Sequence, residues 1–201
     1  MRPSVYVRPN KPSTMHVTRR RGAPIVALPS LAAPITIDKD SECHVTPPDE
    51  AARMALYLGD KEGPTLEPQT GTANLIQALY DTGTLAKDIT AVERHHGLCQ
   101  IIKDRFTEDQ HITPIHQCFL EYAAETKGNA SYSRILMNPP FRHIKKHMAA
   151  ALSLLDHNEG STLVALVPVT YSHDDAETLE TLSNDTFSTA KVFTKIIRIR
   201  R

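Results

Sequence analysis

The tetrapeptide Asn138-Pro139-Pro140-Phe141 combines residue types that can hold an amino group attached to an aromatic ring. It follows the mostly apolar run 134–137, which predicts a short buried strand that delivers the four residues into a loop. Proline has a fixed φ and no N–H, so the loop is stiff and its carbonyls are left to accept hydrogen bonds. With the Asn138 side-chain oxygen they can accept both N–H bonds of an exocyclic amino group, while Phe141 stacks on the ring. Because Asn-Pro also begins ordinary turns, a purely structural interpretation stays open.

This motif resembles the Asn-Pro-Pro-Phe/Tyr motif of class I S-adenosylmethionine (SAM) methyltransferases that modify amino groups, notably the N6-adenine DNA methyltransferases. The resemblance extends over residues 42–201 and implies an α/β fold, a three-layer Rossmann-like sandwich with a mostly parallel seven-stranded sheet. It implies SAM as the cofactor and direct methyl transfer without a metal. Asn138 and the Pro139 carbonyl would hold the amino group, Pro140 would belong to the same catalytic loop, and Phe141 would bind the substrate ring. A target base within a duplex would first be flipped out.

A second motif lies in residues 65–75, where a short strand, a small-residue turn and a helix are expected. Glycine lets such a turn approach a ligand closely, and the helix N-terminus offers free N–H groups. The stretch resembles the Glu-Pro-x-x-Gly-x-Gly motif of SAM methyltransferases, with Ala73 in place of the last glycine. This resemblance assigns Glu67 to the ammonium group of SAM, and Pro68 and Gly71 to the loop around its methionine part.

Acidic and aromatic residues follow the next two expected strands. The strand 89–93 ends in Glu93, and a carboxylate at the end of the second strand of a doubly wound sheet can accept hydrogen bonds from both ribose hydroxyls. The stretch 115–120 contains Cys118 and Phe119. The resemblance places a carboxylate that contacts adenine where Cys118 stands, and it assigns Phe119 to packing on the adenine of SAM. An ordinary buried Cys118 is the favoured alternative.

Two further residues are candidates for ligand contact. Thr46 is expected to N-cap a helix that ends near Leu58, since prolines and acidic residues follow it. Thr46-Pro-Pro also resembles an N-terminal SAM-contacting motif of one class of DNA methyltransferases. Phe187, in the loop before the last expected strand, is a candidate second stacking partner for the target base, with ordinary packing as the alternative.

Periodicity predicts the remaining elements. Helices are expected near 97–105 and 143–157, a central buried strand at 162–167, a short helix at 174–182 and a final strand at 190–200. His143 and His147 have the spacing of a helical metal pair, but no third ligand is near in sequence, so no metal site is predicted. Alternation of strands and helices predicts a mostly parallel sheet with ligands at the carboxyl ends of its strands.

Charge divides the 201 residues into two parts. Six of the 23 basic residues and none of the 23 acidic residues lie in residues 1–37, so the rest of the chain carries a net charge of −6. Residues 1–41, which are also rich in proline, are therefore predicted to form a basic extended or disordered arm that contacts nucleic acid or a partner, or only adds solubility. Residues 42–201 are the predicted catalytic domain. Three widely spaced cysteines and the lack of a long apolar run predict a cytoplasmic protein without a membrane span.

Three functions are consistent with these features. The first is methylation of adenine N6 in DNA by a protein of a phage or mobile element, with target recognition supplied by the arm, by a homodimer or by another protein. The second is the same chemistry on RNA or on a protein glutamine. The third is a SAM-fold protein that has lost catalysis and acts as a binding or inhibitory module, as Ala73 and Cys118 suggest.

Overall fold

The structure is a computed structural model that describes residues 45–106, 111–186 and 192–201. The predicted arm and the loop residue Phe187 lie outside the described residues. Residues Glu42–Arg201 form one compact unit. No helix of the described part of this unit is long and apolar enough to cross a membrane.

Strands from the described residues form a seven-stranded sheet in the order β3-β2-β1-β4-β5-β7-β6. The pairs β3–β2, β2–β1, β1–β4 and β4–β5 are parallel, whereas β7 is antiparallel to both β5 and β6. The prediction of a seven-stranded, mostly parallel sheet is confirmed. The strands are β1 Thr65–Glu67, β2 Ile89–Glu93, β3 Ile115–His116, β4 Arg134–Met137, β5 Thr162–Pro168, β6 Glu177–Leu182 and β7 Thr194–Arg200.

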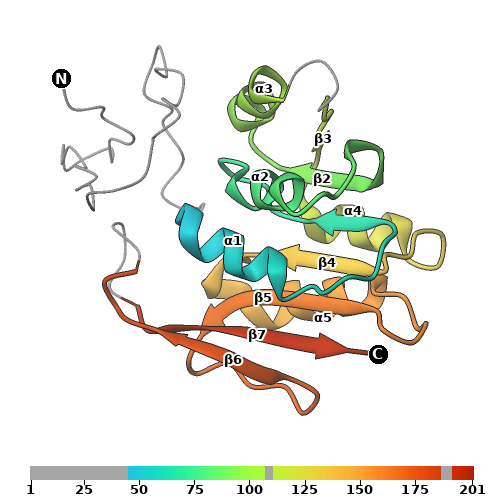
Figure 1. Cartoon of the computed structure of the whole chain (residues 1–201). Helices are drawn as coiled ribbons and strands as arrows, with labels where there is room; N and C mark the ends of the chain where they lie inside the picture. The colour runs from blue at the N-terminus through green and yellow to red at the C-terminus, as the bar shows by residue number, and fades with distance from the viewer. Residues whose placement is uncertain (1–44, 107–110, 187–191) are drawn as a thin grey trace, which may run out of the picture. The chain divides into compact units, whose positions relative to one another are not determined.

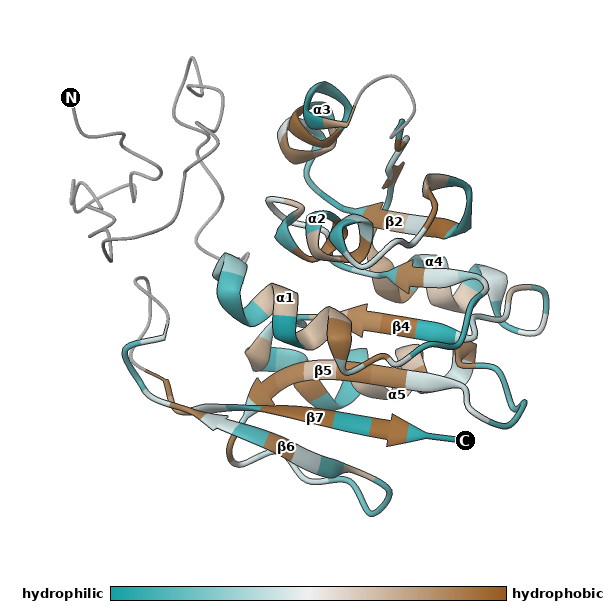
Figure 2. Ribbon diagram, viewed as in Figure 1, coloured by the Kyte–Doolittle hydropathy of each residue, from teal (hydrophilic) through white to brown (hydrophobic). Residues whose placement is uncertain are grey.

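Helices cover both faces of this sheet (Figure 1). On β4, Ile135 and Met137 pack with α4 and α5, whereas Leu136 packs with α1 and α2 on the opposite face. Since strand side chains alternate between faces, a strand buried on both faces is expected to be mainly apolar, and β4 and β5 are largely hydrophobic in Figure 2. The helices are α1 Pro48–Leu56, α2 Asn74–Asp81, α3 His96–Arg105, α4 Phe119–Thr126 and α5 Ile144–Leu154, with 3₁₀ turns at Ala86–Asp88 and Phe141–His143.

The prediction of a helix at residues 174–182 is wrong, because Glu177–Leu182 is strand β6. This strand lies at the edge of the sheet and is stabilised by antiparallel pairing with β7, with a register shift between Thr178 and Glu180. Of its side chains only that of Leu182 is buried. An edge strand exposed on both faces lacks the apolar alternation by which a strand is recognised.

The capping prediction for Thr46 is also wrong. Pro47 is the N-cap residue of α1 and no side chain caps the helix, which ends at Leu56. The Thr46 hydroxyl is instead engaged outside the helix, as described below. The boundary of the last strand also differs from the prediction, since β7 begins at Thr194.

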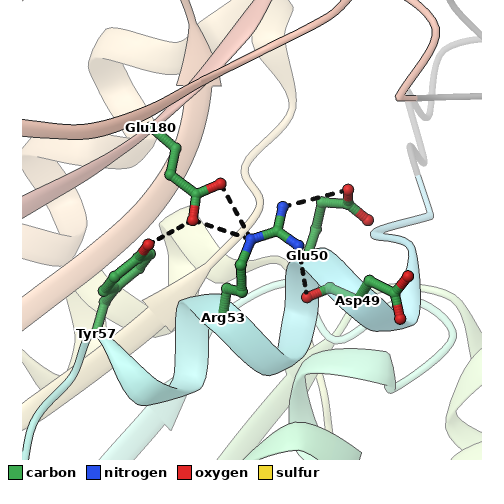
Figure 3. Close-up of polar contacts among 5 residues, drawn as sticks. All are labelled: Asp49, Glu50, Arg53, Tyr57 and Glu180. Carbon is green, nitrogen blue, oxygen red and sulfur yellow. Dashed lines mark hydrogen bonds and ion pairs between the residues drawn. The ribbon is translucent and has the colours of Figure 1, made fainter.

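A cluster of polar side chains fastens α1 to β6 (Figure 3). The Arg53 Nε donates to both carboxylate oxygens of Glu180, at 2.9 and 3.0 Å, and the Tyr57 hydroxyl donates to Glu180 Oε1. Arg53 also contacts Glu50 Oε1 at 3.4 Å. The cluster thereby connects the first described helix with an edge strand 127 residues away in sequence.

Candidate active site

The loop between β1 and α2 is fastened to the end of β2 by Glu93. The Gly71 N–H donates to Glu93 Oε2 at 2.8 Å, and the His95 N–H donates to Oε1 at 2.7 Å. The Thr70 N–H and hydroxyl both donate to the Val92 carbonyl, at 3.0 and 3.1 Å. Glu93 therefore organises the glycine loop, and each of its oxygens keeps one further lone pair that can accept a hydrogen bond.

Ala73 stands in the left-handed region, with φ of 64°, directly before α2. For a residue with a Cβ this conformation costs about 1 kcal/mol or more. The Cβ is fully buried beside Ile76 and Ile102, and its burial offsets part of that cost. Ala73 thus adopts the backbone conformation for which glycine is better suited, and the turn forms although no glycine stands at this position.

Arg105 of α3 holds the same loop from the other side. Its Nη1 donates to the Thr72 carbonyl at 2.8 Å and to Asn74 Oδ1 at 3.1 Å. Burial lowers the pKa of this guanidinium. Sequence reasoning missed Arg105, because nothing in the order of residues shows that the end of α3 returns to the glycine loop.

Glu67 lies at the carboxyl end of β1 and is fully buried. Burial is the main reason why its pKa is raised to about 8, and the Glu93 carboxylate adds to the effect. Its Oε1 is 3.4 Å from the Gln69 N–H, and its Oε2 has no hydrogen-bond partner within the described residues. A buried carboxyl oxygen without a partner is costly unless a donor ligand reaches it.

Thr46 joins the glycine loop to the Asn138 loop. The Asn138 Nδ2 donates to the Thr46 hydroxyl oxygen at 2.9 Å, and the Asn74 Nδ2 donates to the Thr46 carbonyl at 2.8 Å. Asn138 follows β4 directly, and β4 neighbours β1, where the order of the parallel strands reverses. Ligands of open α/β sheets bind outside the strand ends at such a reversal. The structure therefore brings together Thr46, Glu67, Gly71, Glu93 and Asn138.

The other predicted site residues have different surroundings. Pro68 and Pro139 are buried, Pro140 and Phe141 are half-buried, and Cys118 is a half-buried free thiol at the start of α4. Phe119 is 3% exposed and stacks on the His147 ring, with 6.1 Å between centroids. Its predicted contact with adenine stays a prediction, as does the role of Cys118. The stacking role of Phe187 falls outside the described residues.

Gln69 and His147 form a contact that sequence reasoning also missed. Gln69 Nε2 lies 2.8 Å from His147 Nδ1, so the glycine loop is bonded to the helix that follows Asn138. Burial, followed by the charges of His143 and Arg94, lowers the pKa of His147 to about 4. The ring is therefore neutral near pH 7, and its Nδ1 accepts the hydrogen bond. No group of side chains in the described part of the chain has the composition of a metal site.

Three buried polar atoms at this end of the sheet have no partner within the described residues: Glu67 Oε2, Gln69 Oε1 and His95 Nε2. Glu67 is the last residue of β1, Gln69 is the second residue after β1, and His95 is the second residue after β2. Two are acceptors and the third belongs to an imidazole. Such a set suits a ligand with an ammonium group and hydroxyl groups, so the residues present fit SAM.

Comparisons with known proteins give the fold. Neither a protein-family model nor a curated protein matches the chain in sequence. A type I restriction–modification methyltransferase subunit from Streptococcus thermophilus matches in structure, with a TM-score of 0.63 and 14% identity over 78% of this chain and 44% of the subunit. A dimethyladenosine transferase from Plasmodium falciparum has a TM-score of 0.56 and 12% identity over 74% of this chain and 60% of its own. The chain has the methyltransferase fold.

A third methyltransferase-fold structure is similar in size to this chain. It is a protein from Haemophilus influenzae classed provisionally as a methylase, with a TM-score of 0.53 and 12% identity over 74% of this chain and 92% of its own. The restriction–modification subunit, by contrast, is spanned for less than half of its length. At these identities the similarity establishes the fold, and the activity has to be argued from the site.

Proposed function

We propose that this protein is a SAM-dependent methyltransferase that transfers a methyl group to an exocyclic amino group, most specifically N6 of adenine in DNA. The observation that carries the proposal is the position of Asn138-Pro139-Pro140-Phe141. This loop follows β4 at the reversal of strand order and is joined through Thr46 to the glycine loop. The full architecture in this proposal is the three-layer sandwich of the SAM methyltransferases.

Residues at the ends of β1 and β2 would hold the cofactor. Glu67 would pair with its ammonium group, Pro68 and Gly71 would line its methionine part, and Glu93 would accept from its ribose. Thr46, Cys118 and Phe119 complete the proposed set. When bound there, SAM supplies an electrophilic methyl group on a positively charged sulfur.

Residues after β4 would hold the amino group. Because Thr46 accepts from the Asn138 Nδ2, the amide is oriented, and its oxygen is the acceptor end. Asn138 and the Pro139 carbonyl would accept the two N–H bonds, which fixes the nitrogen lone pair in direction and draws electron density onto nitrogen. The nitrogen held in this way would be the acceptor of the methyl group that SAM supplies when bound, and the proton that the nitrogen loses on methylation would pass to solvent. Positioning and electrostatics supply the rate enhancement.

A planar aromatic substrate is supported by Phe141, which is half-buried in this loop. A ring stacked on Phe141 and Phe187 would explain why an aromatic residue follows the prolines. Nucleic acid is the proposed partner, and a second copy or another protein would supply target recognition.

The experiment is a methyl-transfer assay with SAM labelled in its methyl group. Substrates are adenine-containing DNA, the matching RNA and a glutamine-containing peptide, and digested products are identified by mass spectrometry. We expect N6-methyladenine from DNA and a loss of at least about a hundredfold in Asn138→Ala, since the amino group is then no longer held. Methylated peptide, or cytosine methylation instead of adenine, would overturn the assignment of the target atom.

A further inference from the structure

The net acidic charge of residues 42–201 conceals a basic sector at the carboxyl ends of the strands. The segments 94–96 and 138–147, which follow β2 and β4, contain no Asp or Glu, and neither does segment 115–118, which comprises β3 and the two residues after it. They carry basic and imidazole side chains instead. We define the basic rim as Arg94, His96, His116, His143, Lys145 and Lys146, all of which are exposed.

Contacts join the segments at β2 and β3, and electrostatics relates them to the segment after β4. The His96 and His116 rings meet edge to face, with 5.6 Å between centroids, and His116 Nε2 donates to the Arg94 carbonyl at 3.1 Å. Besides burial, the charges of His143 and Arg94 both lower the pKa of His147, so both lie near that ring, and His147 is bonded to Gln69 of the glycine loop. The rim residues of β2, β3 and α5 therefore lie near the glycine loop and the Asn138 loop.

Other acidic residues lie on segments away from the rim. Asp185 follows β6, and Asp49 and Glu50 lie in the first turn of α1. Glu93 directly precedes Arg94, but it is buried and its two oxygens accept from the Gly71 and His95 N–H groups. Within the described residues, no carboxylate forms an ion pair with Arg94, Lys145 or Lys146. Their charges are thus available to an anionic ligand.

We infer that the basic rim binds the sugar–phosphate backbone of a nucleic acid strand whose target base is held by the Asn138 loop. The inference rests on the proposed function and names the surface that supplies substrate binding within residues 42–201, in addition to the arm. A strand on the rim neutralises lysine and arginine charges with phosphates, and the acids after β6 and at the start of α1 disfavour its binding on those segments. The exposed imidazole ring of His143, two residues after Phe141, also suits stacking with a base.

The occupant is a nucleic acid and not an acidic protein for two reasons. The rim mixes cations with aromatic rings, which is the combination that binds single strands through phosphate and base together. It also borders the loop whose residue types suit an amino group on an aromatic ring. An acidic peptide would use the charges but would leave the rings without a function.

The test is binding of a fluorescent single-stranded oligonucleotide to the full chain, measured by anisotropy over a range of salt concentrations. The variant is Lys145→Gln with Lys146→Gln. The matched control is Lys87→Gln with Lys127→Gln, which removes the same charge from two exposed positions. Lys87 precedes β2 and Lys127 follows α4, so both lie at the amino ends of the strands, away from the rim. Both proteins retain residues 1–41, so any contribution of the arm is equal.

We expect the rim variant to bind at least roughly tenfold more weakly at 0.1 M salt, with the slope of log K against log salt reduced by about 1.4. The control should bind within about twofold of wild type. Equal weakening in both variants, no weakening in either, or equally tight binding of polyglutamate would overturn the inference. SAM titration of the same proteins separates the two proposals. If wild type binds SAM and the rim variant binds the oligonucleotide as tightly as wild type does, only the inference about the rim is wrong. If wild type does not bind SAM, the proposed function is wrong.

Discussion

At the scale of single residues, the central feature is a carboxyl group in a place that disfavours its charge. Glu67 is fully buried, and its Oε2 has no partner in the described part of the chain. Its pKa of about 8 means that the acid is mostly protonated at neutral pH in the absence of a ligand. A cationic ammonium group would reverse this balance, so the proposed pairing is coupled to release of a proton.

The pH dependence of stability follows from the same pKa. The folded state holds the proton up to about pH 8, while an unfolded glutamic acid releases it near pH 4.5. The unfolded state therefore binds fewer protons between these values, and stability falls as pH rises from about 4.5 to 8. Between pH 6 and 8 we expect Glu67 to account for a loss of about 2 kcal/mol in the free energy of unfolding.

Urea denaturation at pH 6 and pH 8 tests this prediction. Glu67→Gln keeps the shape of the side chain and cannot ionise, so this variant should lose about 2 kcal/mol less than wild type over the interval. Parallel losses in the two proteins would show that Glu67 is ionised in the folded state and would remove the argument for coupled proton release.

At the scale of elements, Thr46 connects three segments that meet at the strand ends. Thr46→Val removes the hydroxyl that accepts from Asn138 and should destabilise the fold by about 1 kcal/mol. Thr46→Ser retains the acceptor and should stay within about 0.5 kcal/mol of wild type. Unfolding free energies of the two variants check this, and an equal loss in both would assign the effect to lost packing and not to the hydrogen bond.

The cluster of Arg53, Tyr57 and Glu180 belongs to the same scale, since it joins α1 to β6. Hydrogen bonds from Tyr57 and Arg53 outweigh the effect of burial and lower the pKa of Glu180. Its stabilising contribution is therefore present above the ordinary glutamate pKa and is lost as the pH falls below it. Glu180→Gln should cost about 1 kcal/mol at pH 7.

Glu177→Gln is the matched control, because Glu177 pairs with Arg198 within the sheet and its side chain is 57% exposed. Exposed pairs contribute little, so we expect a change below about 0.5 kcal/mol in urea denaturation. If Glu177→Gln costs as much as Glu180→Gln, the cluster has no special role in fastening α1.

Elements with a buried apolar pattern could be predicted from the sequence. Elements whose conformation depends on hydrogen bonding to a distant strand could not. The sequence of β4 and β5 is mostly apolar because both faces are covered, so their predicted bounds agree closely with the structure. Strand β6 is exposed and owes its conformation to β7, which is distant in sequence. The predicted cap of Thr46 failed for a related reason, since its hydroxyl bonds to a residue 92 positions away.

At the scale of the whole molecule, the order of elements predicted where the site lies but not how it is held together. Motifs after β1, β2 and β4 were expected to meet because parallel strands share one carboxyl end. The contacts of Arg105, Gln69 and His147 depend on how α3 and α5 return to that end, and no local pattern encodes this. The same is true of charge: a sum over residues 42–201 is negative, although one sector of the strand ends is basic.

The central claim is that the ends of β1 and β2 form a SAM site, and calorimetric titration with SAM tests it most directly. We predict saturable binding in the micromolar range at pH 8, weaker binding at pH 6 with release of close to one proton, and loss of binding in Glu67→Ala and Glu93→Ala. Glu177→Gln, which changes an exposed residue of β6 outside the proposed site, is the control that should bind as wild type does. Absence of binding at millimolar SAM would contradict the account. So would an affinity of the Glu67→Ala and Glu93→Ala variants equal to that of wild type.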